Sequence, residues 1–584
     1  MNQPNGILFS SPNITLRGDS QAMSRLLAGP SCTVLLQTQG LPSAQAGHIE
    51  LFDLALDGNF SRPDSILLSA NGALMESLSV RRCEFRKFVF AALFAAGRNV
   101  RFEHCTFNNF GKGTGTAIEF TAGFEDVAIA HCRFVWCADG IIVDTDDATM
   151  SHTTQNILIE DNYFDLGWYT LPARFSGSGI GVSYTASTIT DTTAAFVTDG
   201  VAPQTYFRVM PTRCTGTVSA STKRSLSDSS ASFSTDGIIV GEIVRATAVD
   251  YSGFAVVSAI GSDTQLQVEE WLDDRTRQPL APPPINASYT IYGVYLGWVT
   301  DPITGTSATM YAGRWFDLNG QEVIPANGTR YEFLPKPNYP IHMESGVRNV
   351  KILHNTLKRG YSDQISINGN DATISGNHIM WGQDMGITLG GTSGDGHSIV
   401  AENHLYKCGA GGISIVESEH STVAHNVAKA TTWVNGVEDG RGALGGIVFI
   451  RANSISVVGN VCNGQALPHA MSGIVLIDSK NITLSANSIT NVGKYAVRVM
   501  GTSVGGIRST IDNDFWSVAL PFFHGDPIYE PPAPGGLYDL QGSGSPEGVV
   551  VAGPASTYRD VTNGQIYLKR AGTAALGWVL MQTL

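Results

Sequence analysis

Residues 352–379 read ILHNTLKRGYSDQISINGNDATISGNHI and contain one short motif twice. The motif is an apolar residue, two variable residues, Asn, one variable residue and an apolar residue, and its asparagines, Asn355 and Asn377, stand 22 residues apart. Between the copies, Ile365 and Ile367 alternate with polar residues, which is typical of a β-strand. A short strand pattern repeated at a near-constant period indicates a solenoid built from strands.

The same motif recurs along most of the chain, with Cys in place of Asn in the first three copies. Apart from one gap of 193 residues, consecutive copies lie 22 to 34 residues apart, and most carry a second apolar alternation such as GIIV or GGISIV. This pattern predicts coils of a parallel β-helix, with inward amides that hydrogen-bond from coil to coil. The aligned residues are Cys83, Cys105, Cys132, Asn162, Asn355, Asn377, Asn403, Asn426, Asn460, Asn487 and Asn513.

Composition narrows the classes of partner. The chain has 584 residues, 64 of them Gly, and only 15% are charged, which favours an all-β protein with many tight turns. A net charge of −14 and the absence of Lys/Arg clusters from the sequence argue against nucleic acid as a binding partner. No stretch approaches 18 consecutive apolar residues and no signal peptide is recognisable, so we expect neither membrane insertion nor signal-directed export.

Cysteine usage and acidic runs give little sign of a bound metal or cofactor. Eight cysteines are too sparse for a disulfide scaffold and lack metal-ligand spacing, so we expect buried free thiols. The run VDTDDA, with Asp144, Asp146 and Asp147, offers oxygen ligands for Ca²⁺ but lacks a fuller ligand spacing. We therefore predict no metal and no cofactor.

The motif spacing divides the chain into five parts. We expect the β-helix in residues 1–186 and 336–516, with a small inserted β domain at 187–335. The insertion contains an echo, because DTTAAFVTDGV from Asp191 recurs as DSSASFSTDGI from Asp228 and predicts two partial repeats. A Pro/Gly-rich linker at 517–550 and a C-terminal β-hairpin module at 551–584 complete the prediction.

Two resemblances follow from these motifs. The repeated coils resemble the pectin-lyase-like superfamily of right-handed parallel β-helices, and the final YRD…NG.IYLK..GT…GWV pattern resembles a short module of phage tail and spike proteins. The second resemblance implies a virion protein released at lysis, homotrimeric, bound to other tail proteins and directed at a host surface polysaccharide. It also accounts for a polysaccharide-facing helix without an export signal.

Two aspartates form the candidate catalytic pair. Asp363 and Asp384 stand just before the apolar alternation of consecutive coils, offset by one residue, so their carboxylates are expected roughly 5 to 8 Å apart. This range spans both glycosidase geometries. Polygalacturonases, which the pair resembles in position, would have a histidine near Ala410 and an Arg-Ile-Lys element, and this chain lacks both. The alternative is that both aspartates are ordinary turn residues.

Nearby positions add candidate substrate-binding residues. Glu344, Asn368, Glu417, Arg451 and Asp478 are expected in one column at the ends of the GI.I strands, suited to a hydroxyl-rich or charged glycan. His342 and Trp381 are expected beside it, the Trp as a stacking face for sugar. The predicted substrate-binding set is therefore His342, Glu344, Trp381, Glu417 and Arg451, and solvated surface residues are the alternative.

The sequence thus predicts a phage tail spike or receptor-binding protein that recognises a host cell-surface polysaccharide, and it leaves open whether the protein also depolymerises that polysaccharide through Asp363 and Asp384. Hydrolysis is slightly favoured over lyase chemistry. Two alternatives stay open: a structural or adhesive tail protein without enzymatic activity, and a cellular pectin-lyase-like polysaccharide hydrolase or lyase.

Overall fold

A computed structural model of the chain contains strands, turns and bends, and no helix among the residues that it describes. The described part is residues 7–583 without 9–12, 22–23, 30–31, 38–46, 59–65, 71–75, 95–96, 110–114, 122, 145–153, 171–172, 204, 275–278, 311–313, 335–337, 391–395, 433–444, 466–471, 494, 501–507, 510–512, 519, 525–538, 543, 551–552, 555, 561 and 573–574.

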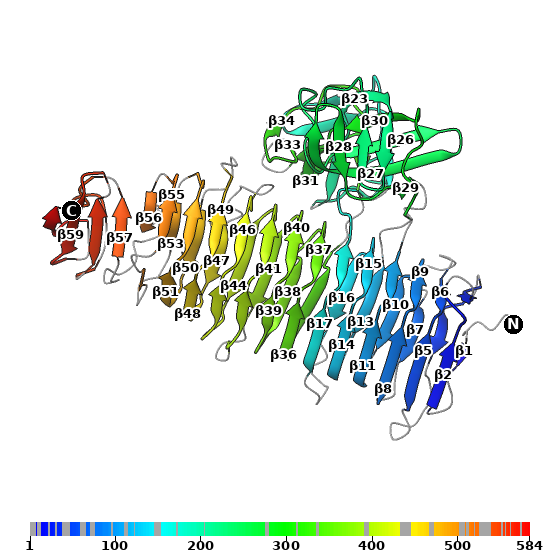
Figure 1. Cartoon of the computed structure of the whole chain (residues 1–584), viewed down its shortest axis with the longest axis horizontal. Coiled ribbons are helices and arrows are strands. Elements are labelled where there is room, and N and C mark those ends of the chain that lie inside the picture. The colour runs from blue at the N-terminus through cyan, green and yellow to red at the C-terminus, as the bar shows by residue number, and fades with distance from the viewer. Residues whose placement is uncertain are drawn as a thin grey trace. The chain divides into compact units, whose positions relative to one another are not determined.

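Most strands belong to a parallel β-helix whose coils each contribute to up to three sheets (Figure 1). The first sheet contains β1 (Ile7–Leu8), β4 (Val34–Gln37), β7 (Ile66–Ala70), β10 (Phe90–Phe94), β13 (Thr116–Phe120), β16 (Asp139–Val143), the start of β36 (Ile341–Leu353), β38 (Ile365–Asn370), β41 (Met385–Gly390), β44 (Gly411–Val416), β47 (Gly445–Ile450), β50 (Ser472–Ile477), β53 (Tyr495–Met500) and β56 (Leu520–His524).

The second sheet follows the first in each coil. It contains β2 (Asn13–Arg17), β5 (His48–Phe52), β8 (Ser77–Arg81), β11 (Gly97–Glu103), β14 (Phe124–Ala130), β17 (Gln155–Glu160), the end of β36, β39 (Thr373–Ser375), β42 (Ile399–Ala401), β45 (Thr422–Ala424), β48 (Asn453–Val458), β51 (Lys480–Ser485) and β54 (Arg508–Ser509). The start of β36 pairs with β38 in the first sheet and its end pairs with β39 in the second sheet. Backbone hydrogen bonding is therefore continuous between the two sheets at this strand.

The third sheet closes each coil with strands of three residues. It contains β3 (Arg25–Leu27), β6 (Ala55–Asp57), β9 (Glu84–Arg86), β12 (Thr106–Asn108), β15 (Arg133–Val135), β18 (Tyr163–Asp165), β37 (Thr356–Lys358), β40 (His378–Met380), β43 (His404–Tyr406), β46 (Val427–Lys429), β49 (Val461–Asn463), β52 (Ser488–Thr490) and β55 (Asp514–Trp516). The predicted all-β parallel solenoid is confirmed.

Alternating apolar residues fill the interior of the coils. In the third sheet, the rings of Phe107 and Phe134 stack with centroids 4.7 Å apart, and those of Phe134 and Phe164 are 4.4 Å apart. Glycine before the first-sheet isoleucines keeps the corner narrow: a Cβ on Gly386 would lie 2.3 Å from the Leu405 side chain. The glycine of the GI.I pattern therefore marks a position where the first-sheet strand packs closely against the third-sheet strand of the same coil.

The asparagines form a buried ladder at the turn between the second and third sheets. Asn403 Nδ2 donates to Asn426 Oδ1 at 2.9 Å and to the Ile374 carbonyl at 2.9 Å. Its Oδ1 accepts hydrogen bonds from the Asn377 side chain and backbone at 2.9 and 3.1 Å. Each amide thereby satisfies polar groups of neighbouring coils, and the same pattern continues from Asn162 to Asn513.

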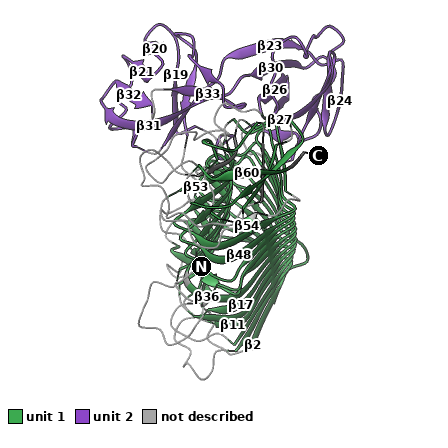
Figure 2. Cartoon of the chain, turned by 90° about the vertical axis from the view of Figure 1, so that its left-hand side faces the viewer, with its two compact units in different colours: residues 1–109, 114–167, 337–584 green, residues 110–113, 168–336 purple. Residues whose placement is uncertain are grey.

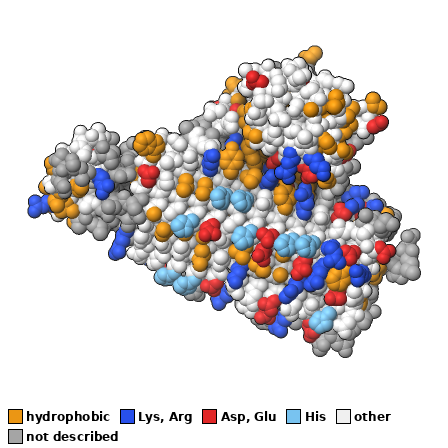
Figure 3. Space-filling view, in the orientation of Figure 1, with side chains coloured by type: hydrophobic (Ala, Val, Ile, Leu, Met, Phe, Trp, Pro, Cys, Tyr) orange, Lys and Arg blue, Asp and Glu red, His pale blue; other side chains and the backbone are white. Residues whose placement is uncertain are grey.

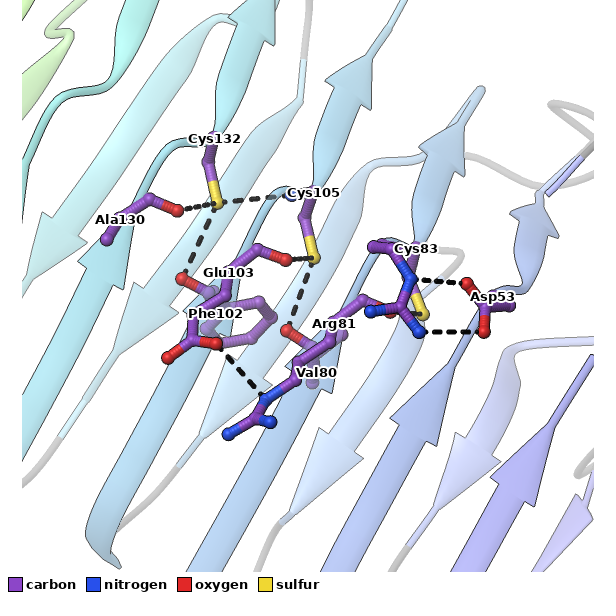
Figure 4. A network of polar contacts seen from close by, with 10 residues as sticks. Asp53, Val80, Arg81, Cys83, Phe102, Glu103, Cys105, Ala130 and Cys132 are labelled. Carbon is purple, nitrogen blue, oxygen red and sulfur yellow. Dashed lines mark hydrogen bonds and ion pairs between the residues drawn. The ribbon is translucent and has the colours of Figure 1, made fainter. Parts of the chain in front are cut away.

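Three cysteines occupy the same ladder position in the N-terminal coils (Figure 4). The Cys132 N–H donates to Asn162 Oδ1 at 2.8 Å, and the Cys105 N–H lies 3.4 Å from Cys132 Sγ. Burial raises the pKa of the Cys83 thiol to about 12, with a further increase from Cys105. All eight cysteines are free thiols, and seven are buried, so those in the ladder act as packing groups.

A second compact unit is inserted between coils (Figure 2). It comprises residues 110–113 and 168–336, so the expected start at residue 187 falls inside it. Its outer module contains β19 (Phe175–Gly177), β20 (Val182–Tyr184), β21 (Thr188–Asp191), β22 (Tyr206–Val209), β31 (Tyr295–Ile303), β32 (Ser307–Met310), β33 (Trp315–Asp317), β34 (Glu322–Val323) and β35 (Tyr331–Phe333).

An inner module is nested between β22 and β31. It contains β23 (Thr212–Thr217), β24 (Ala220–Thr222), β25 (Ser225–Ser227), β26 (Ile243–Ala248), β27 (Tyr251–Ser262), β28 (Gln265–Val268), β29 (Leu272–Asp273) and β30 (Ser288–Tyr292). The order β23-β30-β26-β27-β28-β25-β24 matches β19-β35-β22-β31-β32-β21-β20 strand for strand.

The sequence echo marks the same buried contact in both modules. Tyr331 donates its hydroxyl to Asp191 at 2.7 Å, and Tyr289 donates to Asp228 at 2.8 Å. Each aspartate also accepts a backbone N–H from two residues further on, at 2.8 and 2.9 Å. The two modules are thus structural copies, one placed in the β22–β31 connection of the other.

The C-terminal region forms a four-stranded sheet of β57 (Asp539–Gly542), β58 (Thr557–Asp560), β59 (Gln565–Lys569) and β60 (Trp578–Thr583). The hairpin β58–β59 turns at the TNG sequence. Two expected boundaries differ from the structure. The helix extends past residue 516, because β56 pairs with β53, and β57 joins the C-terminal sheet from within the expected linker 517–550.

Replacing a ladder amide should destabilise the helix. Asn403→Ala leaves buried donors and acceptors on neighbouring coils unsatisfied, at a cost of about 1–3 kcal/mol for each unsatisfied group. We expect a lower midpoint and faster unfolding in guanidinium, followed by tryptophan fluorescence. Asn368→Ala, which removes an exposed amide from the first sheet, is the matched control. Equal stability of both variants would show that the ladder contributes nothing.

Candidate active site

Register brings three side chains from distant sequence positions into one row at the start of the first-sheet strands. Ile141 pairs with Ile341 and Ile341 pairs with Ile365, which places Asp139, Tyr339 and Asp363 on successive coils, each two residues earlier. The next residue in this row is Met385, and Asp384 precedes it. We call Asp139, Tyr339, Asp363 and Asp384 the acidic edge.

Hydrogen bonds fix two of these carboxylates. Asp139 Oδ1 accepts the Tyr339 N–H at 3.1 Å, and Oδ2 accepts the Thr116 hydroxyl at 3.3 Å. Asp363 Oδ1 accepts the Met385 N–H at 3.2 Å. All three hydrogen bonds run between neighbouring coils, so Asp139 and Asp363 stabilise the packing of one coil on the next.

The four groups of the acidic edge also interact electrostatically. Burial raises the pKa of the Tyr339 phenol; a hydrogen bond with Ser362 lowers it, and Asp363, Asp384 and Asp139 raise it further. Burial likewise raises the pKa of Asp139, against the hydrogen bonds that it accepts. All three carboxylates therefore lie within electrostatic reach of one phenol.

His342 and Glu344 lie on the outer face of the same coil, next to the acidic edge. The rings of His342 and Tyr339 stack with centroids 4.3 Å apart, and His342 Nε2 is 3.6 Å from Glu344 Oε1. Burial lowers the pKa of His342, with an opposing effect from Asp144. The imidazole is thus held in its neutral form at neutral pH, available as a hydrogen-bond donor or acceptor.

Glu417 and Arg451 lie elsewhere. Val416 pairs with Ile450, so Glu417 and Arg451 occupy the corner after the strands, at the opposite end from the acidic edge. Arg451 Nε donates to Glu417 Oε1 at 2.7 Å, and both side chains are about half exposed. Five residues of strand, at about 3.3 Å each, separate this corner from the strand starts.

The expected single column of charged residues was wrong by one position. Glu344 and Asn368 each come directly after a pair in register, Met343 with Ile367, whereas the other three residues come one position after the strand residues that share the row of Asn368. These three are Glu417, Arg451 and Asp478. The three later residues have φ of 53°, 50° and 50° and belong to the turn. Counting back from the ladder asparagine misses this shift because the number of turn residues varies between coils.

Trp381 does not present an open ring. It is 4% exposed, and the ammonium of Lys407 lies 4.4 Å from its ring centroid. Because Lys407 already covers the indole, its position does not support the predicted role as a stacking face for sugar.

Sequence reasoning left Tyr339 out of the site, although the signal was present. Tyr339 stands two residues before Ile341, as Asp363 stands two before Ile365 and Asp139 two before Ile141. The 193-residue gap hid the match between Asp139 and Tyr339, since the two become neighbours only when the insertion is set aside. Glu119 was also missed; burial raises its pKa, and Asp144 and Asp139 raise it further.

Within the described ranges, no group of three or more His, Cys, Asp or Glu residues is arranged to hold a metal ion. Asp144 belongs to these ranges, whereas Asp146 and Asp147 of the VDTDDA run fall outside them. Likewise, in the part of the chain that the structure describes, no helix has the length and apolar character needed to cross a membrane.

Comparison with known proteins supports the fold. Residues 341–515 match the family described as "Right handed beta helix region", which confirms the predicted handedness for these coils. No curated protein sequence matches the chain.

Solved structures that resemble the chain do so at low identity. The A-module of the Azotobacter vinelandii mannuronan C-5 epimerase AlgE4 is 9% identical with a TM-score of 0.31, over 82% of this chain and 89% of that one. Tailspike protein 3 of bacteriophage CBA120 is 10% identical with a TM-score of 0.29, over 98% of this chain and 62% of that one. The Gp54 tailspike of Acinetobacter baumannii bacteriophage AP22, in complex with capsular saccharide, is 9% identical with a TM-score of 0.19, over 84% and 77%.

The raised pKa of Asp139 predicts how stability depends on pH. The folded state holds this proton more tightly than the unfolded state does, so stability falls as pH rises through the window above the ordinary value of 3.8. Asp139→Asn keeps an acceptor for the Tyr339 N–H without burying a charge. We expect it to match or exceed the wild-type Tm at pH 7 and to lose that part of the pH dependence between pH 4 and 7.

Asp139→Ala is the control for the acceptor, because it removes the hydrogen bonds to Tyr339 and Thr116 and should lower the Tm at every pH. If Asp139→Asn were as unstable as Asp139→Ala at pH 7, the ionised carboxylate itself would be needed for folding.

Proposed function

We propose that the chain is a phage tail spike that recognises a host cell-surface polysaccharide and cleaves it by hydrolysis at the acidic edge. The observation that supports this most directly is the row of Asp139, Tyr339 and Asp363, with Asp384 beside it. Carboxyl groups on neighbouring coils stand about one strand spacing apart, which is the separation at which glycosidases use paired acids.

The chemistry requires different roles for two carboxyl groups. One protonates the glycosidic oxygen, and the other, ionised, attacks the anomeric carbon or activates a water molecule. We assign these roles to Asp363 and Asp384 together. The N–H of Met385 holds the Asp363 carboxylate in place, and Tyr339 and His342 supply polar groups beside the pair.

Hydrolysis is proposed over β-elimination because it needs only the two carboxyl groups that the edge supplies. Elimination would need a base that removes a proton from carbon. Burial and the surrounding carboxylates raise the pKa of Tyr339, which disfavours a tyrosinate base at neutral pH. His342 is the remaining candidate base, so product analysis must separate the two reactions.

The remaining substrate-binding residues fall into two groups, one beside the acidic edge and one at the opposite end of the first-sheet strands. We propose that His342 and Glu344 contact the sugar next to the cleaved bond. Glu417 and Arg451, at the far end of the strands, contact a more distant part of the glycan. Trp381 is left as a packing residue, since its ring is covered.

The catalytic pair can be tested by isosteric substitution. Asp363→Asn and Asp384→Asn should each lower cleavage of host capsule or lipopolysaccharide by about 10²-fold or more, because each removes a proton-transfer group. Cleavage is followed as new reducing ends, with absorbance at 235 nm to detect elimination. Asp371→Asn is the matched control, because Asp371 is exposed in a turn of the same coil at a φ of 57° that Asn tolerates.

Unchanged cleavage in both variants would remove Asp363 and Asp384 from the mechanism. Binding without new reducing ends or absorbance in the wild-type protein would instead favour an adhesive tail protein. An absorbance increase that survives in Asp363→Asn would favour a lyase that uses another base.

We further propose that the protein is a homotrimer that joins other tail proteins in the virion and is released at lysis. Large apolar side chains are exposed in the C-terminal region, among them Val549, Leu576 and Met581 at 71, 64 and 61%. Covering these side chains with further copies of the chain would remove them from water.

Light scattering tests the oligomeric state. We expect a mass three times the chain mass of 62.2 kDa. Leu576→Ser with Met581→Ser should shift the distribution toward monomer, whereas Val249→Ser, which changes a fully exposed apolar residue of the inserted unit, should not. A monomeric wild-type protein would contradict the trimer.

A further inference from the structure

Trp516 carries an open aromatic ring at the C-terminal end of the third sheet. It is 71% exposed, and no other tryptophan in the described ranges is exposed. Within the same ranges, neither a cation nor another ring contacts its indole. Because Trp is highly buried on average, an indole that faces water indicates a binding contact. Trp516 thus has the open ring face that Trp381 lacks.

Polar side chains from the two preceding coils lie in register with this indole. Thr490 pairs with Trp516, and Asn463 pairs with Thr490, so the three residues form one row with a spacing of about 4.8 Å per coil. The middle residue of each of these strands is apolar and packs on the core, so the row points outward. The other outward row of the same strands contains Ser488 and Asp514. The indole is therefore flanked by hydroxyl, amide and carboxylate groups.

Hydrogen bonds hold two amide side chains beside the ring. The Asn491 N–H donates to the Trp516 carbonyl at 3.2 Å, and Asn491 Nδ2 donates to Asn463 Oδ1 at 3.3 Å. The same Asn463 oxygen accepts the Gln465 N–H at 2.8 Å. The amides are thus held in one arrangement before a ligand binds, which reduces the conformational entropy that binding would cost.

Several polar groups around the ring are available to a ligand. In the part of the chain that the structure describes, the side chains of Ser488, Thr490 and Asp514 make no hydrogen bond or ion pair. The two hydroxyl groups can donate and accept hydrogen bonds, and the carboxylate can accept them, which suits the hydroxyl groups of a sugar. An apolar ring with a few polar groups at its edge is the composition of a small-ligand site.

We propose that Trp516 is the centre of a second glycan-binding site, in which the indole packs against the apolar face of a neutral sugar residue and Thr490 and Asn491 bind its hydroxyl groups. The inference takes the host polysaccharide as its ligand and so rests on the proposed function, but it adds a site away from the acidic edge. Trp516 lies four coils beyond Asp384, about 19 Å along the helix axis. A second contact on the same polymer raises the overall affinity without any change at the acidic edge.

Charge around the indole favours a neutral sugar over an anionic one. Asp514 lies two residues before Trp516, about 6.6 Å along the strand, and its carboxylate repels an anionic group. The row that ends at Trp516 first meets a cation at Lys429, three coils and about 14 Å away, beyond the screening length of about 8 Å at physiological salt. Charge is scarce in general, since only 15% of residues are charged, and Figure 3 shows uncharged side chains and backbone over most of the face in view.

A contact with another protein chain fits this surface less well. The centre of a protein interface is apolar and depleted in charged residues. Around Trp516 the flanking groups are hydroxyls, amides and a carboxylate, and Val461, at 36%, is the other large apolar side chain exposed on these three strands. β55 is also the last strand of the third sheet, so its edge could pair with a second copy of the chain. The oligomeric state is therefore part of the test.

Affinity gel electrophoresis of the full chain tests the proposal without cleavage. The Asp363→Asn/Asp384→Asn protein is run through gels that contain hydroxyethyl cellulose, galactomannan or dextran as neutral glycans, or alginate as an anionic glycan. We expect retardation by at least one neutral glycan and less retardation by alginate. In the same background, Trp516→Ala should lower the apparent affinity about tenfold, because it removes the large apolar contact, and Trp516→Phe, which keeps a ring, should lower it less.

Ile399→Ala is the matched control, because Ile399 is an exposed apolar residue, at 45%, on the second sheet of the same helix. The proposal is overturned if none of the neutral glycans retards the protein, if alginate retards it more than they do, or if Ile399→Ala weakens retardation as much as Trp516→Ala. It is also overturned if Trp516→Ala reduces the mass found by light scattering, since the indole would then lie in a contact between copies of the chain.

Binding and cleavage are measured separately, so the two proposals can fail separately. Retardation that depends on Trp516, together with no cleavage by the wild-type protein, contradicts the catalytic proposal alone. Cleavage by the wild-type protein, together with retardation that does not depend on Trp516, contradicts the second glycan-binding site alone.

Discussion

Coil-to-coil hydrogen bonding at a fixed register is the constraint on which the rest of the molecule depends. In the ladder that begins at Asn162, the side-chain N–H groups of a buried amide donate to the coils on both sides, and its oxygen accepts from the preceding coil. An error of one residue would turn the inward side chains of a coil outward and break both sets of bonds. Because that cost recurs in every coil, the register is uniform enough to align side chains on the surface.

The inserted unit shows how strictly this register is kept. Asn162 and Asn355 are 193 residues apart, yet Asn162 Nδ2 and Asn355 Oδ1 are 3.0 Å apart, as in the uninterrupted coils. Asp139 also accepts a hydrogen bond from Tyr339, 200 residues later. The helix therefore continues through the insertion as if it were one long turn, and the acidic edge exists only because the register survives it. Within the inserted unit, the inner module likewise lies in the connection between β22 and β31, and these two strands of the outer module still pair with each other.

Much of the fold could be predicted because its cause is periodic. Inward asparagines, isoleucine alternation and corner glycines recur in nearly every coil, so no single residue had to be interpreted alone. The candidate site was harder to predict than the fold, because the positions of its residues depend on turn lengths that differ between coils. Glu417 and Arg451 were displaced by one position for this reason, and Tyr339 was hidden behind the insertion. Trp381 illustrates another limit: its indole is covered by Lys407 from the next coil, and burial of a turn residue has no sequence period.

The arrangement of charge follows from the same geometry. Each coil presents three faces, so residues a few positions apart in sequence can belong to surfaces of opposite charge, as Lys358 and Asp363 do. Screening at physiological salt limits interactions between exposed charges to about 8 Å, so the exposed charges on one face of a coil act largely independently of those on another face.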